Sequence, residues 1–186
     1  ARAMGIYHVY SPVVDVNNNA NNPVINVRSY GENPEDVGRF GAAMVEGVQS
    51  ANVIATAKHF PGHGDTAVDS HSGLPIINLP RERFEAVELV PFRKAIESGV
   101  ASIMIAHISL PQFDNEQIQP IKNPIISAYS ESVEVPKESA TIPATLSKKV
   151  QTDLLRNQMN FQGLIVSDAM DMSGLTLYIG QEEAAI

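Results

Sequence analysis

The strongest constraint on the fold is a regular alternation of apolar segments with helical patterns along the 186 residues. Strands are predicted where the apolar segments are continuous, at 9–16 (VYSPVVDV), 53–60 (VIATAKHF), 100–110 (VASIMIAHISL) and 164–170 (LIVSDAM). Helical patterns occupy the intervals between these segments. Continuous apolar strands that alternate with helices are typical of a parallel sheet covered by helices. The sequence therefore predicts an α/β fold.

Two of the helical intervals carry recognisable start signals. Asn33 is a favourable N-cap, and Pro34 suits the first helical position. Apolar residues then recur at helical spacing and predict one buried face, made of Val37, Phe40, Met44, Val45 and Val48. A second helical stretch covers 81–98, and Pro91 is expected to begin a new helix within it.

Polar residues recur where the predicted strands end, namely Asp15, Lys58, His59, His107 and Asp168. This placement is typical of a (β/α)8 barrel of the TIM type, whose active sites lie at the carboxyl ends of the strands. A complete barrel needs eight strand–helix units, and only about four are recognisable here. We therefore interpret residues 1–186 as a partial catalytic barrel domain that lacks its N- and C-terminal segments. The proline-rich region 111–145 is predicted to be an irregular excursion over the barrel mouth.

Composition excludes several classes of protein. The net charge of −8 and the pI near 5.0 argue against nucleic acid as a partner, because phosphates require a basic surface. The absence of cysteine excludes disulfides, thiol catalysis and cysteine-ligated metals. No apolar run reaches the roughly eighteen residues of a membrane span. These features leave the compartment open between the cytoplasm and the outside of the cell.

The segment 58–71 (KHFPGHGDTAVDSH) concentrates three histidines, two aspartates and a lysine around glycine and proline. A polar loop on a rigid scaffold is a common location for chemistry. Asp69 and His71 are two residues apart, so in an extended segment their side chains lie on the same side. The aspartate would then orient the imidazole as a general acid and base near neutral pH. An ordinary solvated loop fits the same tripeptide.

Three roles are open for Asp168, which follows an apolar strand: nucleophile, metal ligand, or ion-pair partner of Lys58. Lys58 and His59 end another strand, so their side chains are expected to diverge. A metal-dependent hydrolase is an alternative, with ligands from His59, His63, Asp65, Asp69 and His71. These residues lack the helical spacing of known zinc motifs, and Pro61 prevents a helix there. We therefore expect proton transfer, with no metal and no cofactor.

Four separated segments resemble glycoside hydrolase family 3, and within it the bacterial β-N-acetylglucosaminidases. They are KHFPGHGDTAVDSHSGLP, SPVVDVNNNANNPVINVRSYGENPEDV, IPATLSKKVQTDLLR and GLIVSDAMDMSGL. The resemblance implies a retaining mechanism in which Asp168 is the nucleophile. It also implies that His71 is the acid/base, that Asp69 is its partner, and that Arg28, Lys58 and His59 bind the sugar.

The function implied by this resemblance is that of a retaining exo-β-N-acetylglucosaminidase acting on muropeptide- or chitin-type glycans of the cell wall. A β-glucosidase and an N-acetylglucosaminide phosphorylase of the same family are alternatives. An inactive sugar-binding fragment is an alternative of another class. The expected partners are a carbohydrate substrate and the remaining segments of the parent chain, which would complete the barrel.

Overall fold

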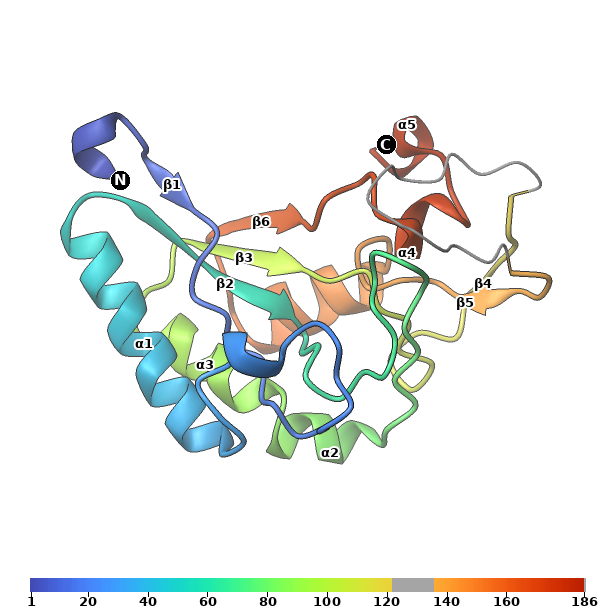
Figure 1. Ribbon diagram of the computed structural model, residues 1–186, viewed down its shortest axis with the longest axis horizontal. Coiled ribbons are helices and arrows are strands. Elements are labelled where there is room, and N and C mark those ends of the chain that lie inside the picture. The colour runs from blue at the N-terminus through green and yellow to red at the C-terminus, as the bar shows by residue number, and fades with distance from the viewer. Residues whose placement is uncertain (122–135, 186) are drawn as a thin grey trace.

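The computed structural model of the chain describes residues 1–121 and 136–185, and its centre is a four-stranded parallel sheet (Figure 1). The strands are β1 (His8–Val9), β2 (Ile54–Phe60), β3 (Ser102–Ile105) and β6 (Leu164–Ser167). They lie side by side in the order β1-β2-β3-β6, and every neighbouring pair is parallel. The predicted α/β class is confirmed.

Helices follow the strands and cover one face of the sheet. The longer ones are α1 (Pro34–Ser50), α2 (Arg81–Ala86), α3 (Leu89–Glu97) and η3 (Lys149–Gln158). The shorter turns are η1 (Arg2–Met4), η2 (Asn26–Arg28), α4 (Ser173–Thr176) and α5 (Gln181–Ala184). Figure 1 shows α1 and α3 side by side below the sheet, with α4 and α5 beyond the carboxyl ends of the strands.

The predicted start of α1 is confirmed in detail. The Asn33 side-chain oxygen accepts hydrogen bonds from the backbone N–H of Glu35 at 2.9 Å and of Asp36 at 3.2 Å. Pro34 occupies the first helical position, where its missing N–H leaves no donor unpaired. The cap therefore fixes where the chain turns from the preceding loop into the helix.

The predicted buried face of α1 is partly wrong. Phe40 and Met44 are 45% and 39% exposed, whereas Val37 and Val45 are fully buried. The buried side of the helix also contains Gly38 and Gly41. A Cβ at Gly38 would lie 2.4 Å from Lys94 Cδ of α3, and a Cβ at Gly41 would lie 2.6 Å from Val14 Cγ1, so the glycine side of α1 is the side that packs inward.

The strands are shorter than the apolar segments that predict them. Segment 9–16 contributes only the end of β1 and an isolated bridge between Val13 and Lys58. Pro12 has no N–H for a sheet hydrogen bond, so the ladder is interrupted there. Segment 100–110 is a regular strand only in β3, and 164–170 only in β6. The remaining residues of these segments continue as loop at the strand ends.

The hydrophobic core lies between the sheet and the helical layer. Its aromatic centre is Phe60 of β2 against Phe92 of α3, with ring centroids 5.1 Å apart in an edge-to-face arrangement. Both rings are fully buried. The predicted division of the second helical stretch is present, since α2 ends at Ala86 and α3 begins at Leu89. The new helix thus begins two residues before Pro91 and not at Pro91.

Part of the predicted excursion at 111–145 falls on residues 122–135, which lie outside the described residues. Its described parts contain β4 (Gln117–Ile118) paired antiparallel with β5 (Ala140–Thr141). Figure 1 places this pair beyond the carboxyl end of β3. Over 1–121 and 136–185, no helix is both long and apolar enough to cross a membrane.

Candidate active site

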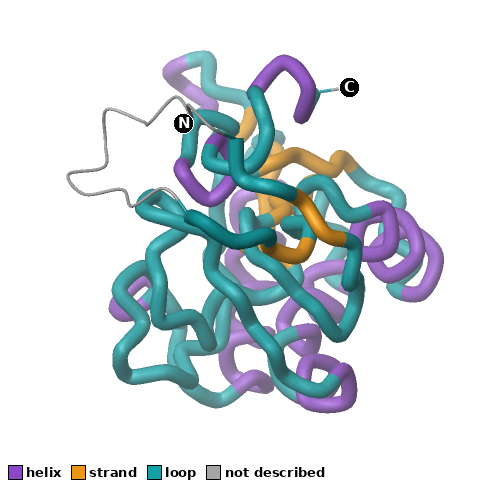
Figure 2. The backbone as a smooth tube through the Cα atoms, turned by 90° about the vertical axis from the view of Figure 1, so that its right-hand side faces the viewer, coloured by secondary structure: helices purple, strands orange, loops and turns teal. Residues whose placement is uncertain are grey.

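The carboxyl ends of β2, β3 and β6 lie at one end of the sheet, where loops dominate the surface (Figure 2). His59 lies one residue before the end of β2, and Asp168 directly follows β6. The backbone N–H of Asp168 donates to the Ile105 carbonyl of β3 at 2.9 Å. The parallel pairing of β3 with β6 thus places the Asp168 carboxylate at the rim of the sheet.

Asp168 approaches a histidine and not a lysine. Its Oδ2 lies 4.0 Å from His59 Nε2, and its side chain is 19% exposed. Within the described residues Lys58 forms no salt bridge with Asp168 inside 4.0 Å. The interpretation of Asp168 as an ion-pair partner of Lys58 is therefore wrong, and its carboxylate stays accessible.

The charged groups of the site affect the pKa of Lys58. Partial burial and the neighbouring Arg28 lower the pKa of Lys58, while Asp168 and Asp15 act in the opposite direction. The charge of Asp168 thus acts on Lys58, whereas the His59 ring contacts the carboxylate at 4.0 Å, and the expected divergence of the two side chains stays a prediction.

The predicted hydrogen bond between Asp69 and His71 is present. His71 Nδ1 lies 2.7 Å from Asp69 Oδ1, and the His71 backbone N–H donates to the same oxygen at 2.9 Å. The segment is a turn and not extended, because the Asp69 carbonyl also accepts from Ser72 and Gly73. A carboxylate only accepts, so it favours the tautomer with hydrogen on Nδ1 and leaves Nε2 unprotonated in the neutral ring.

Between these two partly exposed side chains, Ser70 is buried and tied to its surroundings. The Ser70 carbonyl accepts a hydrogen bond from the Gly174 N–H at 2.9 Å, and its hydroxyl lies 3.2 Å from His63 Nε2. Gly174 belongs to α4, in the segment after Asp168. The loop that carries Asp69 and His71 is thus hydrogen-bonded to the chain that leaves the Asp168 strand.

His63 is buried, and both of its ring nitrogens have hydrogen-bond partners. Its Nδ1 lies 2.8 Å from the Thr66 hydroxyl, so both ring nitrogens face hydroxyl groups. Burial lowers the pKa of His63 against the opposing effect of Asp15. The Asn22 side-chain amide donates to the carbonyls of His63 and Gly64 at 2.8 and 2.9 Å. This buried cluster fixes the start of the loop.

His107 is likewise a hydrogen-bonded core histidine. Its Nε2 lies 2.9 Å from the Ala169 carbonyl, and its Nδ1 lies 2.8 Å from the Thr145 hydroxyl. Burial lowers the pKa of His107, while its contact with Ala169 and the charge of Asp168 oppose this effect. The neutral ring therefore supports the backbone directly after Asp168.

Asp15 is a site residue whose role the sequence reasoning missed, although its position at a strand end was noted. Its carboxylate is fully buried. Oδ2 lies 2.7 Å from His59 Nδ1, and Oδ1 accepts the His63 N–H at 2.7 Å. The available signal was a carboxylate within the apolar run VVDV, because such a charge requires buried partners.

The metal-site alternative gains no geometric support. Within 1–121 and 136–185, no three histidine, aspartate or glutamate side chains are grouped as metal ligands. His59 Nδ1 faces Asp15, and both nitrogens of His63 face hydroxyl groups.

The predicted sugar-binding residue Arg28 is exposed, and its Nη1 donates to the Val24 carbonyl at 3.3 Å.

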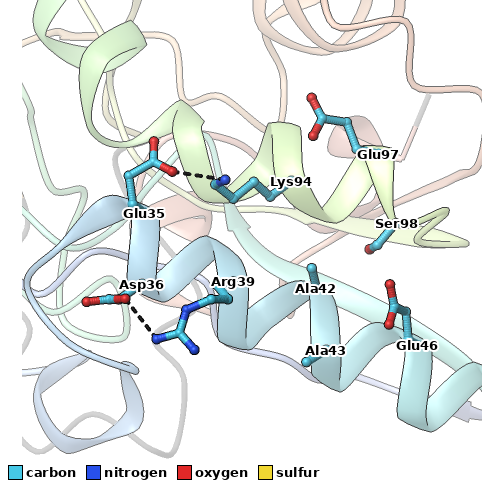
Figure 3. A pocket seen from close by; sticks show the side chains of 9 residues that line it. All are labelled: Glu35, Asp36, Arg39, Ala42, Ala43, Glu46, Lys94, Glu97 and Ser98. Atoms are coloured by element: carbon cyan, nitrogen blue, oxygen red, sulfur yellow. Dashed lines mark hydrogen bonds and ion pairs between the residues drawn. The ribbon is translucent and has the colours of Figure 1, made fainter.

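A separate groove of about 530 Å³ lies on the outer helical layer, between α1 and α3. Figure 3 shows its charged walls, in which Glu35 pairs with Lys94 and Asp36 pairs with Arg39, each at 2.9 Å. The groove contains none of the predicted site residues. The Glu35–Lys94 pair connects α1 to α3, whereas the Asp36–Arg39 pair lies within α1.

Comparisons with known proteins assign the chain to a family. The β-hexosaminidase A of Pseudoalteromonas piscicida is 42% identical over 185 residues, which are 99% of this chain and 29% of that protein. The β-N-acetylglucosaminidase/β-glucosidase of Cellulomonas fimi is 34% identical over 99% of this chain and 30% of its own length. The chain thus spans about 30% of the length of these relatives.

A solved structure agrees with these relatives. The family 3 β-N-acetylglucosaminidase of Paenibacillus sp. str. FPU-7 superposes with a TM-score of 0.84 at 42% identity, over 99% of this chain and 30% of that chain. The model of the glycosyl hydrolase family 3 N-terminal domain matches residues 1–186. The four parallel strand–helix units are accordingly part of a TIM-barrel-like domain, and the chain belongs to glycosyl hydrolase family 3.

Proposed function

We propose that the protein is a retaining, exo-acting β-N-acetylglucosaminidase that removes terminal N-acetylglucosamine from muropeptide- or chitin-type glycans. The observation that carries this proposal is the 2.7 Å contact between Asp69 and His71, which leaves His71 Nε2 available for proton transfer. The names of the similar bacterial proteins support the same substrate class.

In the first step, the Asp168 carboxylate attacks the anomeric carbon while the bond to the leaving oxygen breaks. Imidazolium His71 gives its Nε2 proton to that oxygen, so the leaving group departs as a neutral alcohol. The product is a glycosyl ester on Asp168 and a neutral His71. Asp69 stabilises the charged ring before the transfer and holds its orientation afterwards.

In the second step, His71 Nε2 removes a proton from water, whose oxygen attacks the anomeric carbon and displaces the Asp168 carboxylate. Two inversions at the same carbon give net retention. Arg28, Lys58 and His59 are proposed to contact the sugar hydroxyls and to hold the anomeric carbon near Asp168. The 4.0 Å contact of His59 with the carboxylate and the charge effects of Asp168 and Arg28 on Lys58 support this assignment.

The decisive experiment uses Asp168→Asn in the full-length enzyme. We expect kcat for a chromogenic N-acetylglucosaminide to fall by about 10³-fold or more, because the amide is a poor nucleophile. A slow fluorinated substrate should leave a glycosyl adduct on wild-type Asp168 that intact-mass measurement detects and that the variant lacks. Normal turnover by the variant would refute the assignment of the nucleophile.

Phosphorolysis is a second candidate, favoured by the cationic Lys58, on which the charges of Arg28 and Asp168 both act, and by a histidine where other glycosidases have a carboxylic acid. Such a site does not repel an incoming phosphate anion. Turnover that requires inorganic phosphate and releases a sugar 1-phosphate would identify this acceptor. Chelator treatment tests the metal-dependent alternative, since the proposed mechanism predicts full activity without metal.

A further inference from the structure

The Asp15 carboxylate contacts both His59, near the end of β2, and His63, where the loop to Asp69 and His71 begins. It is fully buried between Val14 and Val16, at the end of the first apolar segment. The His59 backbone N–H lies 3.2 Å from each of its oxygens, in addition to the contact of Oδ2 with the His59 ring. Oδ1 also accepts the His63 N–H. One carboxylate thus contacts His59 three times and His63 once.

These contacts determine the state of the His59 ring. Burial would raise the pKa of Asp15, but the hydrogen bonds and charges of His59 and His63 lower it overall, so the carboxylate is ionised at neutral pH. An ionised carboxylate cannot donate, so the hydrogen between Asp15 and His59 belongs to Nδ1. His59 Nε2 then points at Asp168 Oδ2, 4.0 Å away. The ring can neither flip nor change tautomer without losing the Asp15 contact.

We propose that Asp15 is a positioning residue that fixes the ring and tautomer of His59, so that Nε2 faces the Asp168 carboxylate and the bound sugar. Through Oδ1 it also holds the His63 N–H, where the loop to Asp69 and His71 begins. The inference rests on the proposed function and deepens it, because it assigns a role in the same reaction to a group that touches no substrate.

The test is Asp15→Asn in the full-length enzyme, with Asp114→Asn as the matched control. Asp114 is also a buried aspartate, and it accepts from the Ser147 hydroxyl at 2.7 Å and from Lys149 Nζ at 2.9 Å. Both substitutions remove a buried charge, and both should lower the urea midpoint. Only Asp15→Asn should also lower kcat/KM, by about 10–100-fold, because a displaced His59 misplaces the groups around Asp168.

A double-mutant cycle with His59→Ala separates positioning from a merely structural role. Asparagine keeps an Oδ1 acceptor for the His63 N–H, so if Asp15 acts through the His59 ring, Asp15→Asn should cost no more than about twofold in kcat/KM when His59 is already alanine. A full loss in that background would overturn the proposal, as would wild-type kcat/KM in the single variant. The Asp168→Asn result judges the proposed function independently of this cycle.

A measurement on the wild-type enzyme keeps the proposal testable if Asp15→Asn does not fold. In ¹⁵N-histidine NMR spectra, the ring of His59, assigned from His59→Ala, should carry its hydrogen on Nδ1 across neutral pH. A neutral ring with its hydrogen on Nε2 alone would contradict the proposal, because Nδ1 would then have no hydrogen to donate to the buried carboxylate.

Discussion

The loop that carries Asp69 and His71 packs against Gly174, and a methyl group at that position would disturb the contact. A Cβ atom at Gly174 would lie 3.0 Å from the carbonyl oxygens of Ser70 and Gly73, and 3.3 Å from His107 Cβ. Favourable carbon contacts begin near 3.5 Å, so Gly174→Ala must push the loop away by roughly a few tenths of an ångström. The hydrogen bond from Gly174 to Ser70 lengthens with it.

The cost of this displacement should appear in activity more than in stability. Overpacking costs about 1–3 kcal/mol, whereas replacing glycine by alanine in a helical turn returns about 1 kcal/mol. The net loss of unfolding free energy is therefore about 0–2 kcal/mol. Misplacement of a catalytic group by about 1 Å can reduce a rate about 100-fold, so a smaller shift of His71 should reduce kcat/KM by roughly tenfold.

The assay compares aryl N-acetylglucosaminides whose leaving groups differ in pKa, together with urea unfolding of the same samples. We expect the loss in Gly174→Ala to be largest for poor leaving groups, because these depend most on protonation by the proposed acid, His71. Gly180→Ala is the control, because a Cβ there meets no atom within 4 Å. Equal kcat/KM for Gly174→Ala and wild type with the poorest leaving group would refute the reasoning.

Two further predictions concern stability. Burial keeps the pKa values of His63 and His107 below 6.5, so at these two rings the unfolded chain binds more protons than the folded chain. The free energy of unfolding should therefore fall as the pH drops through 6.5, by up to about 1.4 kcal/mol per pH unit for each histidine. Urea unfolding at several pH values measures the slope, which His107→Gln should reduce; an unchanged slope would contradict this assignment. Phe92→Ala removes a fully buried ring that packs edge-to-face on Phe60, and it should cost about 3–5 kcal/mol by urea unfolding, whereas a loss below about 1 kcal/mol would mean that the core is packed differently.

Local features of the fold were predictable because their causes are local. The Asn33 cap needs only the backbone of the next three residues, so the start of α1 followed from the sequence. The exposure of Phe40 and Met44 did not follow, since it depends on which side of α1 the sheet and α3 occupy. Periodicity defines a stripe on a helix but does not show how closely glycine residues let that helix approach its neighbours.

The same distinction applies to the candidate site. The Asp69–His71 hydrogen bond joins residues two apart and was predictable, although a turn forms it and not an extended segment. The contact of Asp15 with His59 joins residues 44 apart, so it required the parallel arrangement of the first segment beside β2. The catalytic roles themselves remain predictions from resemblance and geometry, which the variants above test.

The buried cluster around His63 has a practical consequence for laboratory evolution of this protein. Asn22, His63, Thr66 and Ser70 interlock through short polar contacts, whereas Ala67, Val68 and Ser72 are exposed. Positions that tolerate substitution therefore alternate with positions that do not, within one short stretch of the chain. A library that randomises only the outward-facing positions should retain many folded members, while saturation of the whole stretch should yield mostly inactive clones.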